Sequence, residues 1–247
     1  MSGKKQIRLQ DTGERMIPAG EGEVSYVFAR HSFAYDQAVH FTQSKRVIDI
    51  GCGTGYGSNI LAAGADAVLG IDYDSDAIEY CRTNFNAPNL SFVRMDAGSL
   101  SFNKEFDVAV SFQVIEHMPD LHNFLDGIIR AVRRGGTILL TTPNARVPVN
   151  EQHANPFHMN EMNFDQFRNL LSDHFASFEL LGIGYASSNR LRTLIQRSPL
   201  YRLGKYMNRK NPVKKLANAA MSLTEFTILQ SDIARDAIDL FAVCQTD

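Results

Sequence analysis

The chain has 247 residues, of which 44% are hydrophobic and 21% are charged, and its formal net charge is −2. A chain of this composition can bury a sizeable core, which excludes a disordered, collagen-like or coiled-coil protein. No internal repeat of about 20–50 residues is visible, so we expect one domain with insertions rather than a solenoid.

The sequence predicts neither a targeting signal nor a cysteine framework. Residues 1–13 are polar, and no later apolar run approaches the ~18 residues that a membrane span needs. We therefore expect a cytoplasmic protein. Cys52, Cys81 and Cys244 are odd in number and far apart, which predicts unlinked thiols rather than disulfides or a zinc site.

Strand and helix patterns alternate from residue 46 to residue 142. Apolar runs of strand length, bounded by polar or glycine residues, occur at 47–50, 68–72, 90–93, 107–112 and 137–142. Helical stretches lie between them at 56–63, 76–84 and 121–132. This alternation predicts a parallel sheet with right-handed crossover connections.

Further elements flank this region. Apolar residues at loosely helical spacing in 24–41 predict a helix ahead of the sheet, which could be a lid or a packing helix. Two more strands are expected at 178–184 and 238–244. About fifty residues between them look helical and are interrupted by Pro199 and Pro212, so we expect a helical insertion before the last strand.

A glycine-rich turn follows the first predicted strand and leads into a helix. Its sequence runs Asp49-Ile-Gly-Cys-Gly-Thr-Gly55. Glycines permit a tight turn and let a ligand approach bare backbone beside the amide groups of a helix amino terminus. A packing turn of this kind needs no ligand, so the turn by itself leaves both interpretations open.

Two aspartates at the ends of the next strands strengthen the case for a ligand site. Asp72 lies twenty-one residues after Gly51, where a carboxylate can accept hydrogen bonds from both hydroxyls of a ribose. Asp96 ends the third predicted strand in the same way. Because the carboxyl ends of parallel strands meet at one edge, these groups should line one crevice. Alternatively, Asp72, with Tyr73 and Asp74, caps the following helix.

The order of these motifs resembles that of class I S-adenosylmethionine-dependent methyltransferases. Residues 49–55 resemble the first motif of that family, 70–72 the second, 95–97 the adenine-contacting segment, 106–118 the fourth motif and 134–140 the fifth. The resemblance implies a Rossmann-like methyltransferase fold. We therefore expect a three-layer α/β sandwich with a seven-stranded, mostly parallel sheet whose last strand runs antiparallel.

The resemblance assigns the glycine-rich turn to the methionine and ribose parts of the cofactor S-adenosylmethionine, whose product is S-adenosylhomocysteine. Gly51, Gly53 and Gly55, with Cys52 between them, would bracket these parts. Asp49 would hold the ammonium group directly or through water.

The remaining cofactor contacts follow from the same resemblance. Asp72 would accept the ribose hydroxyls, and Tyr73 would pack on the adenine. Asp96 and the Ala97 amide would contact the adenine edge, and Gln113 would lie beside the methionine part.

A nicotinamide dehydrogenase is the rival interpretation, because its fold also places an acidic residue about twenty positions after a glycine turn. Its fingerprint spaces the glycines as G-x-G-x-x-G. Here Gly51, Gly53, Gly55 and Gly57 alternate strictly, which favours the methyltransferase.

The resemblance places the methyl-facing side of the site at the loop after the fourth strand, which contains Glu116 and His117. Methyl transfer from a sulfonium mainly needs the nucleophile held about 3 Å from the methyl carbon. A base is needed only where the acceptor loses a proton that water cannot readily take, as an alcohol or phenol does. His117 could be that base or could only support the cofactor pocket.

A second histidine, His158, ends the stretch Asn155-Pro-Phe-His. This stretch more loosely resembles a branch of the family that acts on sugars and other small secondary metabolites. His158 could be the general base, an acceptor-binding group or a buried structural histidine.

A metal site is the alternative at this loop. Ubiquinone-pathway O-methyltransferases and small-RNA end methyltransferases carry a Glu-x-x-Glu-His metal motif followed by another histidine. Here Gln113 replaces the first glutamate, and an amide is a poorer ligand for a hard cation than a carboxylate. We therefore expect no metal, and a site built from Glu116, His117 and His158 would be weakened.

The segment 186–224 has nine basic residues and no acidic ones. Interleaved apolar residues make it a basic amphipathic stretch, which could rest on an anionic membrane surface, clamp a phosphorylated acceptor or form a solvated lid. RNA binding is less favoured, because the overall charge is not basic and no RNA-binding motif is present. Oligomeric state is not predicted.

Together these patterns predict one methyltransferase domain over residues 1–247. Its expected parts are an amino-terminal cap (1–44), a cofactor-binding core (45–185), a basic helical insertion (186–236) and the last strand (237–247). The expected function is methyl transfer to an oxygen of a small molecule of the sugar, quinone or secondary-metabolite type. The alternatives are an RNA methyltransferase and a non-catalytic S-adenosylmethionine-binding protein.

Overall fold

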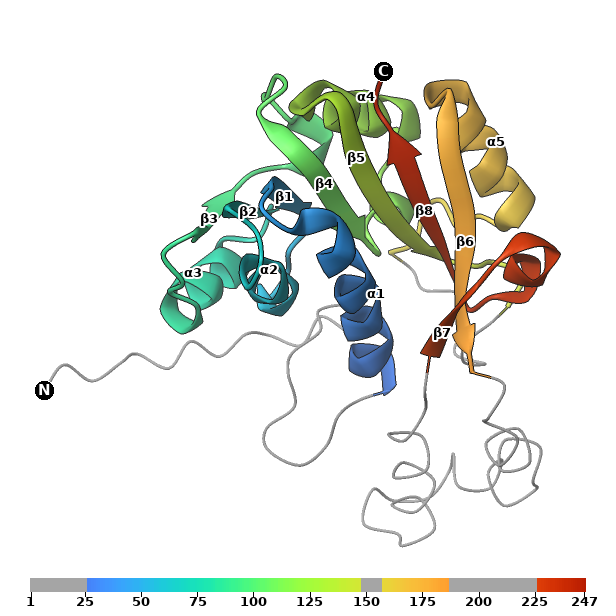
Figure 1. Ribbon diagram of the computed structural model, residues 1–247, viewed down its shortest axis with the longest axis horizontal. Helices are drawn as coiled ribbons and strands as arrows, with labels where there is room; N and C mark the ends of the chain where they lie inside the picture. Colours follow the sequence, from blue (N-terminus) through green and yellow to red (C-terminus); the bar gives the residue numbers. More distant parts are fainter. Residues whose placement is uncertain (1–25, 148–156, 187–225) are drawn as a thin grey trace, which may run out of the picture.

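The computed structural model describes residues 26–147, 157–186 and 226–247, and in these ranges eight strands form one sheet (Figure 1). The strands are β1 (Arg46–Ile50), β2 (Ala67–Asp72), β3 (Leu90–Arg94), β4 (Phe106–Phe112), β5 (Val132–Pro143), β6 (Ser177–Tyr185), β7 (Phe226–Leu229) and β8 (Asp239–Gln245). The helices are α1 (Tyr26–Thr42), α2 (Tyr56–Ala62), α3 (Ser75–Asn84), α4 (Leu121–Ala131) and α5 (Phe164–His174). Short 3-10 helices are η1 (Ala97–Ser99), η2 (Ile115–His117) and η3 (Ser231–Asp236).

The strand order is β3-β2-β1-β4-β5-β8-β6-β7. β1 pairs in parallel with β2 and β4, β2 with β3, and β4 with β5. β8 lies between β5 and β6 and runs antiparallel to both. The expected Rossmann-like α/β fold is confirmed, and its last strand is antiparallel.

The sheet has one strand more than the seven expected. β7 pairs antiparallel with β6 at the edge of the sheet, within the segment that was expected to be helical. The prediction was wrong there because a run of four residues is too short for its periodicity to distinguish strand from helix. The non-local pairing with β6 decides the conformation. In the same expected insertion η3 (Ser231–Asp236) is helical, and residues 187–225 lie outside the described residues.

β5 also begins earlier than expected, at Val132 rather than at residue 137. Its register against β4 shifts between Phe106 and Val108, and Gly135 has a φ of 68°. An irregular strand start of this kind interrupts the alternation of inward and outward side chains, so the sequence pattern did not reveal it.

Helices cover both faces of the sheet, which gives the expected three layers (Figure 1). Val47 of β1 packs in one cluster with Ala38 of α1 and Leu61 of α2. Its neighbour Ile48 packs in another cluster with Phe124 of α4, and α5 contributes to that cluster. Successive residues of a strand point to opposite faces, so β1 is buried on both sides.

The helix α1 packs on the sheet through buried side chains of Ala34, Tyr35 and Ala38. An ion pair also joins its Arg30 to Asp239 at the start of β8, with Nε 3.1 Å from Oδ2. These contacts favour a packing helix over a lid.

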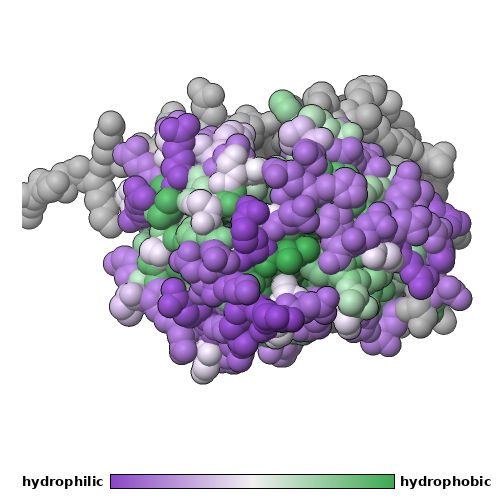
Figure 2. Space-filling model, turned by 90° about the horizontal axis from the view of Figure 1, so that it is seen from above, coloured by the Kyte–Doolittle hydropathy of each residue, from purple (hydrophilic) through white to green (hydrophobic). Residues whose placement is uncertain are grey.

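The surface seen from above is largely hydrophilic, with hydrophobic residues gathered in a limited central area (Figure 2). Within the described residues, no helix is both long and apolar enough to cross a bilayer.

Candidate functional site

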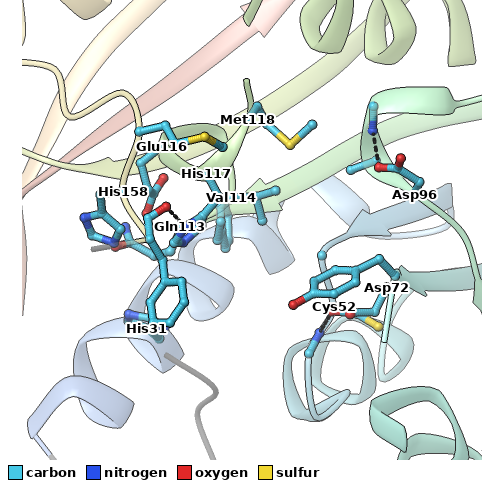
Figure 3. Close-up of a pocket in the computed structure, with 18 of the residues that line it drawn as sticks. His31, Cys52, Asp72, Asp96, Gln113, Val114, Glu116, His117, Met118 and His158 are labelled. Carbon is cyan, nitrogen blue, oxygen red and sulfur yellow. Dashed lines mark hydrogen bonds between the residues drawn. The ribbon is translucent and has the colours of Figure 1, made fainter. Parts of the chain in front are cut away.

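A cavity of about 800 Å³ lies at the carboxyl ends of the parallel strands, and α1 contributes to its wall. Asp72 and Asp96 lie at one end of it (Figure 3). Glu116, His117 and His158 lie at the other end. These residues come from four separate parts of the sequence, and the fold brings them to one crevice as expected from strand order.

The glycine-rich turn forms part of the cavity wall through Gly51, Cys52 and Gly53. Gly51 has a φ of 75°, a left-handed conformation that favours glycine, and a Cβ there would overlap the side chain of Val114. Gly55 does not line the cavity. It precedes α2 with a φ of 77°, and a Cβ there would lie 2.7 Å from Sγ of Cys81, so the packing of the turn also requires this glycine.

Asp72 lines the cavity, half-buried, with both carboxylate oxygens oriented by backbone amides. Oδ2 accepts a hydrogen bond from the Gly53 N–H and Oδ1 one from the Asp74 N–H, both at 2.9 Å. Asp74, rather than Asp72, caps α3, because its side chain accepts from the amides of Asp76 and Ala77. The capping role therefore belongs to Asp74, and Asp72 stays in position for the expected ribose contact.

The residues expected around the adenine lie together at the same end. Tyr73, Asp96 and Ala97 all line the cavity, and the Tyr73 side chain is 72% exposed. Oδ1 of Asp96 accepts the Gly98 N–H at 2.9 Å and so caps η1. An exposed aromatic face beside a fixed carboxylate is compatible with the expected adenine contacts.

Asp49 is fully buried beside α1 and α2 and does not line the cavity. It accepts hydrogen bonds from the hydroxyls of Ser58 at 2.6 Å and Tyr35 at 3.1 Å. Burial raises the pKa of its carboxyl to about 6, against the opposing effect of these two hydrogen bonds. Tyr35, which sequence reasoning missed, does line the cavity. Asp49 therefore contributes to the cavity wall indirectly, through its hydrogen bond with the Tyr35 hydroxyl.

Glu116 is 1% exposed at the opposite end. Its Oε2 accepts a hydrogen bond from the Thr142 hydroxyl at 3.2 Å, and its Oε1 has no hydrogen-bond partner. Burial, reinforced by the charge of Asp239, raises the pKa of Glu116 to about 8, so the carboxyl is neutral at pH 7. Gln113 lies beside it in a left-handed conformation with φ 58°, and its Nε2 donates to Thr141.

The two histidines meet edge to face, with ring centroids 4.8 Å apart. Nδ1 of His117 lies 3.1 Å from the Phe157 carbonyl oxygen, and Nδ1 of His158 lies 2.8 Å from Oε1 of Glu161. Both partners are acceptors when Glu161 is ionised, so each imidazole carries a proton on Nδ1. In a neutral ring Nε2 is then the basic nitrogen.

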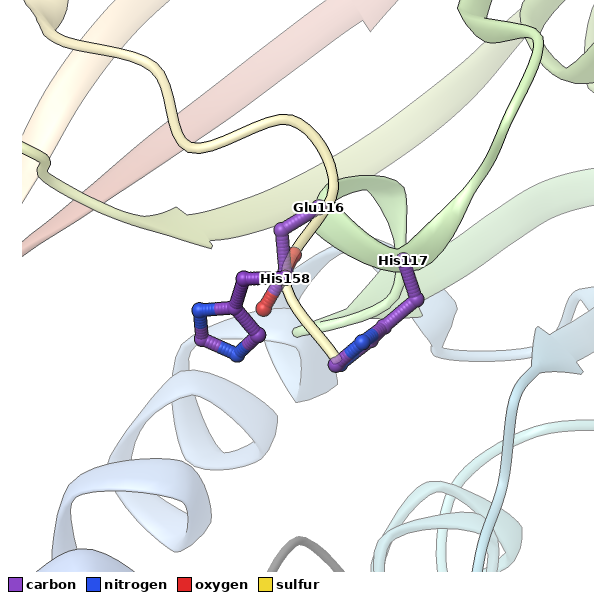
Figure 4. A group of neighbouring side chains, drawn as sticks. All are labelled: Glu116, His117 and His158. Atoms are coloured by element: carbon purple, nitrogen blue, oxygen red, sulfur yellow. The ribbon is translucent and has the colours of Figure 1, made fainter. Parts of the chain in front are cut away.

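Glu116, His117 and His158 each offer one ligand atom, and these atoms lie within 4.8 Å of one another (Figure 4). Two backbone hydrogen bonds fix the loop that carries His158, because the amides of Met159 and Asn160 both donate to the Glu116 carbonyl oxygen. The cluster can exchange a proton with a bound molecule or hold a cation.

A family model described as a methyltransferase domain matches residues 41–197. The chain belongs to the S-adenosylmethionine-dependent methyltransferases. It is 36% identical over 172 residues to a Mycolicibacterium smegmatis protein named as a probable S-adenosylmethionine-dependent methyltransferase, covering 68% of this chain and 65% of that protein. It is 31% identical over 138 residues to a fatty-acid O-methyltransferase of the same organism, covering 55% of this chain and 50% of that protein.

The match therefore spans less than two thirds of these relatives' length.

A chain from the complex of the Haloferax volcanii Trm112 methyltransferase activator with a methyltransferase superposes on this chain with a TM-score of 0.60. It is 17% identical, and the superposition covers 88% of this chain and 91% of that chain, which supports the fold alone.

The described residues of the methyltransferase fit its family's cofactor. The turn at Gly51 and Gly53 presents backbone to the cavity, and the carboxylate of Asp72 is held at the wall by two amides. A ligand with an adenosine ribose needs bare backbone for close approach and a fixed carboxylate for its hydroxyls at such a crevice. The individual contacts of these residues with the cofactor stay predictions.

Sequence reasoning missed two further cavity-lining residues of the methyltransferase, Arg30 and His31 of α1. They lie toward the end that holds Glu116, His117 and His158, which we call the acceptor end because the acceptor is expected there. Burial, with the charge of Arg30 as a second cause, lowers the pKa of His31 to about 3, so this imidazole is neutral. No local pattern marks Arg30, because its partner Asp239 lies in the last strand.

Proposed function

We propose that this methyltransferase transfers a methyl group from S-adenosylmethionine to an oxygen of a small molecule of the sugar, quinone or secondary-metabolite type. The observation that carries the proposal is the His158–Glu161 pair at the end of the cavity away from Asp72 and Asp96. A carboxylate that holds Nδ1–H directs the basic Nε2 of an imidazole toward its substrate.

The bound cofactor supplies a methyl group on a sulfonium, which is a ready leaving group. The protein's part is to hold the acceptor oxygen in line with that methyl group and to remove its proton. We assign proton removal to Nε2 of His158. The neutral carboxyl of Glu116 would hydrogen-bond the acceptor hydroxyl, and His117 would fix the position of the His158 ring through their edge-to-face contact.

The relatives support an oxygen acceptor, because one of them is named as a fatty-acid O-methyltransferase. The match covers only half of the fatty-acid O-methyltransferase. The name of that relative therefore supports oxygen as the methylated atom and does not identify the acceptor molecule of this chain.

A divalent cation is the second candidate at this end. It would be held by Glu116, His117 and His158, whose ligand atoms cluster within 4.8 Å, and Oε1 of Glu116 has no other partner. Such an ion would hold the acceptor hydroxyl and lower its pKa, which would make a protein base unnecessary. We favour the base, because Gln113 contributes no carboxylate and its amide already donates to Thr141.

The function can be tested by measuring S-adenosylhomocysteine release with panels of hydroxylated sugars, quinols and phenols, and in parallel with RNA. A small-molecule acceptor should support turnover and RNA should not. Turnover on RNA alone would favour the RNA methyltransferase. Binding of S-adenosylhomocysteine with no turnover on any panel would favour the non-catalytic alternative. The variant His158→Gln should reduce turnover on that acceptor. His40→Gln, which changes an exposed histidine, is its matched control and should leave turnover unchanged.

A further inference from the structure

Arg30 is a buried cation at the acceptor end of the cavity. Arg30 is 6% exposed and Asp239 is 1% exposed. Nε of Arg30 lies 3.1 Å from Oδ2 of Asp239. Neither Nε nor Nη1 of Arg30 makes a hydrogen bond that meets normal geometry, and Oδ1 of Asp239 is likewise unbonded. The guanidinium therefore has one ionic neighbour and an incomplete set of hydrogen bonds.

An incomplete set of partners is costly for a buried guanidinium. Arginine carries five N–H donors in a planar fork, and a buried donor without an acceptor loses its hydration with no replacement. Among the described residues, Asp239 is the one acidic group within ion-pair distance of Arg30. The fork is shaped to receive two oxygens of one carboxylate side by side.

The other groups near Arg30 do not compete for this role. Among the described residues no ion pair joins Glu116 to Arg30, and Oε2 of Glu116 already accepts a hydrogen bond from the Thr142 hydroxyl. His31 is neutral because burial lowers its pKa to about 3. The carboxylates of Asp72 and Asp96 lie at the opposite end of the cavity (Figure 3). Arg30 is thus a permanent cation at this end of the cavity, and Asp239 is its one ion-pair partner among the described residues.

We propose that Arg30, held from behind by Asp239, binds a carboxylate group of the acceptor molecule. This inference rests on the proposed function and specifies the acceptor class as carboxylic acids. An ammonium acceptor is disfavoured, because it would meet the charge of Arg30 at close range.

The carboxylate could itself be methylated, or it could anchor a molecule whose hydroxyl is methylated. In the first case a carboxylate oxygen bonds to the methyl carbon as the carbon–sulfur bond breaks, its electron pair stays on sulfur, and no proton is released. In the second case the hydroxyl proton passes to His158. The product distinguishes the two, because a methyl ester is cleaved by mild alkali and a methyl ether is not.

The test is calorimetry on the full chain saturated with S-adenosylhomocysteine. The probes are three acids and their uncharged amides: benzoate and benzamide, 4-hydroxybenzoate and 4-hydroxybenzamide, dodecanoate and dodecanamide. At least one acid should bind at least about tenfold more tightly than its amide, as expected for charge-assisted hydrogen bonds. Equal binding within all three pairs would overturn the inference.

Two variants move the result in opposite directions. Arg30→Gln should abolish the preference for the acid. Asp239→Asn leaves the charge of Arg30 uncompensated, so the same acid should bind about tenfold more tightly than it binds the unaltered protein. A purely structural ion pair would predict no gain in Asp239→Asn. Arg168→Gln, at an exposed position of α5, is the control. It should change neither the affinity for the acid nor the affinity for its amide.

Affinity for S-adenosylhomocysteine, measured separately, reports the cofactor end and the folding of each variant. If Arg30→Gln does not fold, the double variant Arg30→Gln and Asp239→Asn removes both charges together and should also lose the preference. Failure of the unaltered protein to bind S-adenosylhomocysteine would overturn the proposed function itself. Retained cofactor binding without any preference for acids would overturn only the carboxylate inference.

Discussion

The hydroxyl of Tyr35 donates a hydrogen bond to Oδ1 of Asp49 across 3.1 Å, and this bond joins α1 to β1 beneath the glycine-rich turn. Both side chains are buried, and Tyr35 also lines the cavity. The absence of a side chain at Gly57 makes room for this contact, because a Cβ there would overlap the Tyr35 ring. One buried bond thus positions both the amino-terminal helix and a part of the cavity wall.

The first prediction concerns this bond. Tyr35→Phe should lower the free energy of unfolding by about 1–3 kcal/mol, because Asp49 loses a donor while buried. Urea denaturation of the protein without ligands measures the change. Tyr73→Phe is the control, since that side chain is 72% exposed, and it should shift stability by less than about 0.5 kcal/mol. Equal effects of the two changes would contradict the structural role of the bond.

The second prediction concerns the pH dependence of stability. The carboxyl of Glu116 has its pKa raised by burial to about 8 in the folded chain, against an ordinary value of 4.5. As pH rises from about 4.5 to about 8, the unfolded chain loses this proton while the folded chain keeps it. Stability must fall across that window and then level off.

The variant Glu116→Gln should remove this part of the slope. The free energy of unfolding of the unaltered protein minus that of the variant should therefore fall between pH 5 and pH 8, by an amount on the order of a few kcal/mol. Denaturation at several pH values in the presence of a chelator measures it. A difference that stays constant with pH would show that Glu116 is ionised in the folded chain.

The third prediction concerns the cofactor end. Asp72→Ala should weaken S-adenosylmethionine binding by about 1.5–3 kcal/mol, the range for hydrogen bonds to a charged group. Asp74→Ala removes the cap of α3 and should cost about 1 kcal/mol of stability while leaving the affinity nearly unchanged. Unchanged calorimetric affinity in folded Asp72→Ala would remove the ribose assignment. NAD should bind far more weakly than S-adenosylhomocysteine, and the reverse order would revive the dehydrogenase.

The fourth prediction separates a protein base from a metal. With a base, turnover should survive EDTA, and His158→Gln should reduce the rate by roughly 10²–10⁴-fold with cofactor affinity nearly intact. With a metal, EDTA should abolish turnover, Mg²⁺ or Mn²⁺ should restore it, and changes to Glu116, His117 and His158 should be similarly damaging. We expect the first pattern. Turnover that is lost to EDTA and restored by a divalent ion would overturn it.

The fifth prediction concerns the basic segment 186–224, with its nine basic residues and no acidic ones. If this segment holds an anionic surface, the protein should sediment with phosphatidylserine vesicles at low salt. Sedimentation should decline as salt rises, because salt screens electrostatic attraction. At physiological ionic strength the attraction between exposed charges reaches only about 8 Å. No sedimentation at low salt would exclude the lipid surface, and recovery with RNA instead would favour the RNA methyltransferase.

The sequence by itself determined where the glycine-rich turn and Asp72 lie, at the end of the cavity where we expect the cofactor. The glycine-rich turn directly follows β1, and Asp72 ends β2, so strand periodicity and turn chemistry placed both at one sheet edge. These signals are local, because side-chain alternation and the backbone freedom of glycine act within a few residues. The same local signals predicted the alternating core and its layers.

Only the tertiary structure decided the acceptor end. Arg30 of α1 meets Asp239 of β8, and the histidines His117 and His158 meet from separate loops. Folding also made β7 a strand, since its pairing partner β6 lies forty or more positions earlier in the sequence. Burial and pairing between distant segments depend on how the whole chain packs. The free energy that selects these contacts comes from desolvation in the assembled core. Local periodicity in the sequence therefore carries no information about them.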